Sequence, residues 1–107
     1  MTKVDYHDSA VPIRSDFAEA HSRFWERLAR PGSWWSSAER IAIARESRAA
    51  WDCPLCKARK AALSPNSVSG EHASCTTLDA VAIEAVHRIA TDAARLTESW
   101  YQGLLRQ

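Results

Sequence analysis

The chain has 107 residues, of which 46% are apolar and 25% charged, with a formal net charge of +1 at pH 7. These values are typical of one soluble domain with a modest core, and they lack the basic excess expected of a nucleic-acid-binding protein. No apolar run approaches the roughly 18 residues that span a bilayer, and the first residues have no apolar leader segment. We therefore expect a cytoplasmic protein with neither a nucleic-acid nor a membrane partner.

The N-terminal third predicts a short extension followed by one helix. We expect residues 1–14 to form the extension and residues 15–107 to form a single helical domain. Asp16 and Glu19 have the three-residue spacing of a capping box, in which the two residues satisfy each other's backbone N–H groups. The Arg-Pro-Gly-Ser turn at 30–33 ends this helix, because Pro and Gly interrupt helical geometry.

Two more helices are predicted on either side of the first cysteine. Ser36 and Glu39 repeat the capping pattern, and the residues after them continue as a helix to about Trp51. Pro54 suits the first turn of a new helix, because its missing N–H would have no partner there. We expect this third helix over residues 54–63.

The C-terminal part predicts a loop and two final helices. Residues 64–77 are rich in Ser and include a Gly, so they are expected to form a loop. Apolar residues recur every three or four positions over 78–91 and again over 93–105, which indicates amphipathic helices. The whole pattern predicts an all-α fold, a compact bundle of about five helices.

Cys53 and Cys56 form a Cys-x-x-Cys pair at the predicted start of the third helix. Unpaired backbone N–H groups and the positive end of the helix dipole favour a thiolate at the first cysteine. The second cysteine lies one turn further on, within reach of a disulfide bond, and Lys57 and Lys60 add positive charge nearby. The pattern therefore favours redox chemistry.

Two other interpretations of the same cysteines stay open. Cys53, Cys56, His72 and Cys75 form a Cys-x2-Cys pair followed by a His-x2-Cys pair, which are zinc-ligand types at zinc-site spacing. Against this set, the residues after Cys56 continue as a helix, whereas zinc knuckles have turn residues there. The third interpretation treats both cysteines as small buried apolar residues, since free cysteine is often buried.

The segments around the cysteines resemble the alkylhydroperoxidase D-like, carboxymuconolactone decarboxylase superfamily, and in particular an uncharacterised peroxidase-related branch of it. The resemblance covers about residues 35–105 and depends on the segments AERIAIARESRAAWDCPLC, DCPLCKARKAALSP, GEH and VHRIATDAARLTESWY. It implies an all-α domain that assembles as a trimer or hexamer. It also implies that Cys56 attacks a hydroperoxide and that Cys53 then resolves the product into a disulfide.

The resemblance is incomplete at the residues that move protons. Active members have a glutamate twelve residues before the first cysteine and a histidine four residues after the second, whereas this chain has Ile41 and Lys60 at those positions. Glu46, about two helical turns before the cysteine pair, is the expected replacement for the glutamate. Lys60 is expected to stabilise a thiolate, and His87 to act as the replacement proton donor.

The main prediction is a thiol-dependent peroxidase or disulfide-exchange protein that needs no cofactor. Its substrate would be a hydroperoxide, its partner a thiol reductant, and its form a homo-oligomer, a trimer or hexamer. One alternative is a catalytically silent oligomeric helical module that keeps only the scaffold. The other is a module stabilised by zinc through the four residues of the second interpretation.

Overall fold

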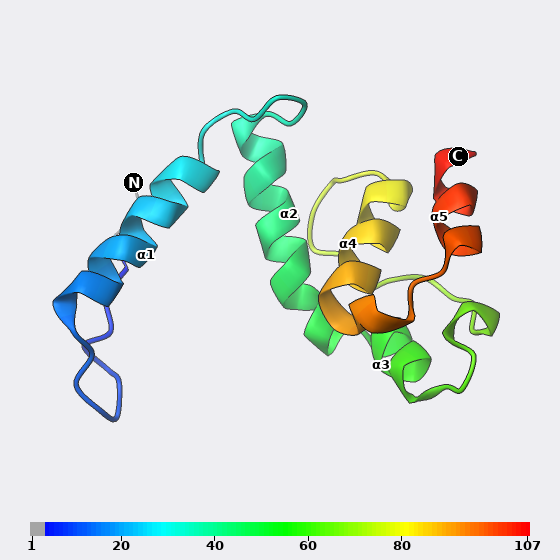
Figure 1. Ribbon diagram of the computed structural model, residues 1–107, viewed down its shortest axis with the longest axis horizontal. Coiled ribbons are helices and arrows are strands. Elements are labelled where there is room, and N and C mark those ends of the chain that lie inside the picture. Colours follow the sequence, from blue (N-terminus) through cyan, green and yellow to red (C-terminus); the bar gives the residue numbers. More distant parts are fainter. Residues whose placement is uncertain (1–3) are drawn as a thin grey trace. The chain divides into compact units, whose positions relative to one another are not determined.

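A computed structural model describes residues 4–107 of the chain (Figure 1). Over this range the chain forms five α-helices and three short 3-10 segments, with no strands, which confirms the predicted all-α class. None of the helices in the described part combines the length and apolar character needed to cross a bilayer.

The chain divides into two compact units, Met1–Ile41 and Ala42–Gln107. The boundary between them falls inside a helix, not at the end of the predicted N-terminal extension. Residues 1–3 of that extension lie outside the described range. The assignment of residues 15–107 to one domain stays a prediction.

Helix α1 (Ser15–Leu28) lies in the first unit and has no buried residue. The predicted capping box at its start is wrong. Asp16 lies inside the first turn, and its carboxylate accepts hydrogen bonds from the guanidinium of Arg14 at 3.1 and 2.8 Å. A neighbouring arginine has therefore taken the carboxylate that would have capped the helix.

Helix α2 (Ser37–Ala49) crosses the boundary between the units. Its predicted capping box is confirmed, because the Ser36 N–H donates to Glu39 Oε1 at 3.0 Å and the Glu39 N–H donates to Ser36 Oγ at 3.1 Å. The helix tightens into a 3-10 turn, η1 (Ala50–Asp52), directly before the first cysteine.

Helix α3 (Pro54–Ala61) begins with Pro54 in its first turn, as predicted, and ends two residues earlier than expected. A second 3-10 turn, η2 (Pro65–Ser67), follows it. From there the chain runs without regular structure to the start of the next helix. This stretch, residues 68–79, is called the connecting loop below.

Helix α4 (Ala80–Asp92) is capped by Asp79, whose side chain accepts from the Ala82 N–H at 2.8 Å. The predicted helix over 93–105 is interrupted. It consists of the 3-10 turn η3 (Ala93–Arg95) and helix α5 (Glu98–Leu105), which Thr97 caps.

The interior of the Ala42–Gln107 unit is small and contains almost as many polar as apolar residues. Helix α4 packs against α3 and η1, and most of the buried residues belong to these three elements. The buried apolar residues of the described chain are Ala50, Cys53, Leu55, Cys56 and Pro65. The buried polar residues are Glu46, His87, Arg88 and Thr91. Because apolar burial is the main driving force of folding, so short an apolar list leaves the unit in need of another source of stability.

Candidate metal centre

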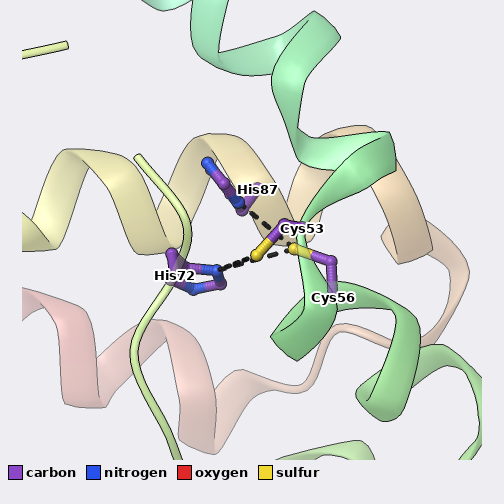
Figure 2. A group of neighbouring side chains, drawn as sticks. All are labelled: Cys53, Cys56, His72 and His87. Atoms are coloured by element: carbon purple, nitrogen blue, oxygen red, sulfur yellow. Dashed lines mark hydrogen bonds between the residues drawn. The ribbon is translucent and has the colours of Figure 1, made fainter. Parts of the chain in front are cut away.

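Four side chains from three segments of the chain converge inside the Ala42–Gln107 unit (Figure 2). Cys53 and Cys56 come from the start of α3, His72 from the connecting loop and His87 from α4. One ligand atom from each lies within 4.8 Å of the others. Cys53, Cys56 and His87 are buried, and the His72 side chain is 8% exposed. The arrangement is compatible with a metal site or with a redox cysteine pair.

The start of α3 places the two thiols. Cys53 is the N-cap residue with extended backbone angles, and Pro54 then fixes the first helical residue. Three residues make almost one helical turn, so the side chain of Cys56 lies above that of Cys53 on the same face. The Ala73 N–H, from the connecting loop, donates to Cys53 Sγ at 3.3 Å. The loop is therefore bonded to the first sulfur.

Both histidine rings present Nδ1 to the sulfurs. His72 Nδ1 lies 3.6 Å from Cys53 Sγ and 3.5 Å from Cys56 Sγ, and His87 Nδ1 lies 3.2 Å from Cys56 Sγ. Tetrahedral zinc, with Zn–S of about 2.3 Å and Zn–N of about 2.05 Å, separates sulfur from nitrogen by about 3.6 Å. The observed spacings are close to that value.

The opposite nitrogen of each ring contacts a carboxylate. His72 Nε2 lies 2.6 Å from Glu84 Oε1, and the same carboxylate accepts from Arg59 Nη1 at 2.7 Å and Trp100 Nε1 at 2.9 Å. His87 Nε2 lies 2.8 Å from Glu46 Oε1, and both of these side chains are fully buried. A carboxylate at Nε2 keeps the proton on that nitrogen and leaves the Nδ1 lone pair directed at the sulfurs, as in carboxylate–histidine–zinc triads.

Glu46 also holds the connecting loop. Its Oε2 accepts from Ser74 Oγ at 2.9 Å, the Cys75 N–H at 3.0 Å, and the N–H and Oγ1 of Thr76 at 2.9 and 2.6 Å. Burial raises the pKa of Glu46, but the hydrogen bonds outweigh it and lower that pKa from 4.5 to about 2. A charged carboxylate thus connects α2, the loop and His87.

The two thiols differ in acidity. Burial raises the pKa of Cys53, but hydrogen bonds from the backbone N–H groups of Cys56 and Ala73 oppose it, and the net effect lowers that pKa from 9.0 to about 6. Burial and the neighbouring Cys53 raise the pKa of Cys56 to about 12. In the metal-free chain the thiolate is therefore favoured on Cys53, whereas the family resemblance implied that Cys56 attacks.

The low pKa of Glu46 predicts a loss of stability in acid. A carboxyl group whose pKa is depressed on folding stabilises the protein above its unfolded-state pKa, and this contribution is lost as the pH falls toward the folded-state value. The window is therefore pH 4.5 to about 2, and the loss is about 3 kcal/mol in the free energy of unfolding. Urea unfolding across this interval measures it. Glu46→Gln has no such proton to take up, so an equal loss in the variant would contradict the assignment.

The structure brings together some of the predicted site residues and separates others. Of the proposed zinc set, Cys53, Cys56 and His72 converge, but Cys75 is exposed and His87 occupies the fourth position. Of the proposed redox set, Glu46 and His87 join the cysteines.

Lys60 is not part of the cluster formed by the cysteines and histidines. Its Nζ donates to the carbonyl oxygen of Thr91 at 2.8 Å and lies 5.8 Å from the centre of the Trp51 ring.

Glu84 was missed by the sequence reasoning. The available signal was its position three residues before His87, among the apolar residues of the first half of the helix, where a charged residue needs a partner. No protein-family model matches the chain, and no curated protein or solved structure matches it either.

Proposed function

We propose that the chain is a zinc-binding module in which Cys53, Cys56, His72 and His87 coordinate one zinc ion. The observation that carries the proposal is the orientation of the two imidazoles, each with Nδ1 at the sulfurs and Nε2 on a buried or half-buried carboxylate. A redox cysteine pair needs neither the second histidine nor the second carboxylate. Two thiolates and two neutral imidazoles are a ligand set that zinc prefers.

The role that this donor set supports is structural. Four protein ligands complete a tetrahedral zinc site, so no position is left for a substrate. The ligands come from α3, the connecting loop and α4, and one ion would hold all three segments together. The ion would compensate for the weak apolar stabilisation of the Ala42–Gln107 unit, because the free energy of metal binding adds to the free energy of folding.

The purified chain is expected to contain one equivalent of zinc. Elemental analysis and a chromogenic chelator assay measure the metal directly. Cys56→Ser is expected to lose it, because a serine hydroxyl is a poor zinc ligand at neutral pH. Cys75→Ser is the matched control, since Cys75 is an exposed cysteine outside the cluster, and it should keep the full equivalent. Zinc lost from both variants, or from neither, would contradict the assigned ligand set.

A thiol-dependent peroxidase or disulfide-exchange protein is the second candidate. The specific observation in its favour is a hydrogen-bonded row from Glu46 Oε1 through both nitrogens of His87 to Cys56 Sγ, with separations of 2.8 and 3.2 Å. In this scheme Cys56 gives its thiol proton to His87 Nδ1 and takes one oxygen from a hydroperoxide. The proton then passes to the leaving alkoxide, which gives a sulfenic acid and an alcohol. Cys53 then displaces water from the sulfenic acid, forming a disulfide that two electrons from a thiol reductant reopen.

Peroxide consumption by the reduced, metal-free chain separates the two candidates. The redox candidate expects turnover with a thiol reductant that disappears in Cys56→Ser and persists in Cys75→Ser. Equal consumption by both variants would rule out a role for the Cys-x-x-Cys pair. Full zinc occupancy without any peroxide turnover would support the structural role and contradict the redox candidate.

A further inference from the structure

A buried arginine next to the metal centre takes no part in it. Arg88 follows His87 on α4 and is 2% exposed. Its Nη1 donates to Asn66 Oδ1 at 2.7 Å, which fixes the plane of the guanidinium. Its Nε and Nη2 are also buried, and neither has a hydrogen-bond partner among residues 4–107. Because most buried N–H groups in proteins are paired, this edge requires an explanation.

The unpaired atoms form one complete edge of the guanidinium. The N–H bonds of Nε and Nη2 point in the same direction, and their spacing matches the two oxygens of a carboxylate or a phosphate. Two adjacent N–H groups on one edge have the form of a bidentate binding site.

The local charge also favours an added anion. Two carboxylates attract the positive charge of Arg88, but each already forms an ion pair with another arginine. Glu84 pairs with Arg59 at 2.7 Å, and Asp92 pairs with Arg95 at 2.6 Å. The positive charge of Arg88 is therefore left without a partner of its own in a buried position. An unpaired buried charge is costly, and an oxyanion at the free edge would remove that cost.

Helix α5 covers the site and offers the means of entry. The Trp100 ring lies 5.5 Å from Arg88 Cζ, and Trp100 also lines a cavity of about 600 Å³. Asn66 Nδ2 reaches Thr97 Oγ1, at the N-cap of the helix, at 3.4 Å. The eight residues of α5 include no buried one, so we expect this helix to open locally at a low free-energy cost. Access of an anion to Arg88 requires such an opening.

We propose that the Nε–Nη2 edge of Arg88 binds a small oxyanion, a phosphate or carboxylate group, through two parallel hydrogen bonds beneath Trp100. The free edge belongs to none of the four residues proposed as metal ligands. The two N–H donors of this edge match a ligand that presents two oxygen atoms, so chloride should not replace the ligand.

The test is a titration of the purified chain, with its metal content unchanged, with inorganic phosphate and with acetate. Sodium chloride at equal ionic strength is the reference. The readout is the Arg Nε–Hε region of a proton–nitrogen correlation spectrum, in which the Arg88 signal is assigned by its loss in Arg88→Lys. We expect this signal to shift saturably with phosphate, acetate or both, and not with chloride. The more effective anion identifies the group as phosphoryl or carboxylate.

Arg88→Lys keeps the charge but lacks the two-donor edge, so calorimetry should show binding at least about tenfold weaker. Arg48→Lys makes the same change at an exposed arginine of α2 and should bind like the unaltered chain. Equal binding by the unaltered chain and Arg88→Lys would overturn the proposal, and so would an Arg88 signal that neither anion shifts. If Arg88→Lys does not fold, the Arg88 Nε–Hε signal is assigned by through-bond correlation to its own backbone, and its response in the unaltered chain decides the question.

Discussion

Removal of zinc by a strong chelator is expected to abolish the cooperative unfolding transition of the Ala42–Gln107 unit. Structural zinc sites contribute roughly 10 kcal/mol or more to folding, which is comparable to the roughly 5–15 kcal/mol that stabilises a typical domain. The buried apolar residues number five, and two of them are the cysteines proposed as ligands. Circular dichroism and calorimetry before and after chelation measure the loss of helix and of the melting transition.

Readdition of zinc should restore both signals, and magnesium should not, because magnesium prefers oxygen ligands. Cys75→Ser should behave like the unaltered chain throughout. A chelated chain that keeps its helix content and melts at the same temperature would contradict the structural role of the metal. That result would favour the redox candidate, in which the fold must persist without an ion.

Glu46→Gln is expected to weaken zinc binding by about ten- to a hundredfold, although Glu46 is not a ligand. The glutamine places an N–H₂ group against either the imidazole or the four donors that surround Oε2. Because the carboxylate is fully buried, its loss also leaves those donors without a charged acceptor, at a cost of roughly 3 kcal/mol or more in the free energy of unfolding. Competition with a chromogenic chelator measures the affinity, and urea unfolding measures the stability.

Glu71→Gln provides the matched control, since Glu71 is an exposed residue of the connecting loop. It should change neither the zinc affinity nor the stability beyond about 0.5 kcal/mol. Glu84→Gln should lie between the two variants, because the Glu84 side chain is 22% exposed and water can replace part of what it loses. An affinity for zinc that is the same in Glu46→Gln and Glu71→Gln would contradict the orienting role of Glu46.

Much of the fold was predictable because its signals are local. Reciprocal capping by Ser36 and Glu39 and the first-turn position of Pro54 depend on residues within one helical turn of each other. The two local predictions that failed have local competitors. Arg14 takes the Asp16 carboxylate, and Thr97 caps a new helix where one continuous helix was expected.

The candidate site was only partly predictable because its contacts are distant in sequence. The local spacing suggested that Cys75 is the fourth ligand beside His72, but the Cys75 backbone N–H is bonded to Glu46, and its side chain is exposed. The residue that takes its place, His87, is 31 positions from Cys56. The sequence indicates His87 as a replacement proton donor near the thiols, whereas the zinc set was drawn from the Cys-x2-Cys and His-x2-Cys pairs. Spacing rules identify ligand pairs within a turn or loop. His87 reaches the cysteines only because α4 packs against α3, which sequence spacing does not reveal.

The distribution of these ligands along the chain has a consequence for how folding proceeds. If the proposed zinc site is correct, Cys53 and Cys56 can capture an ion while the rest of the unit is unfolded, because only two residues separate them. His72 then closes a loop of 16 residues and His87 one of 31, counted from Cys56. Doubling the length of a loop adds only about 0.6 kcal/mol to its closure cost, so the second histidine is almost as easy to recruit as the first. The ion would thus form the unit's long-range contacts in chain order, from the start of α3 outward, before most of the interior is packed.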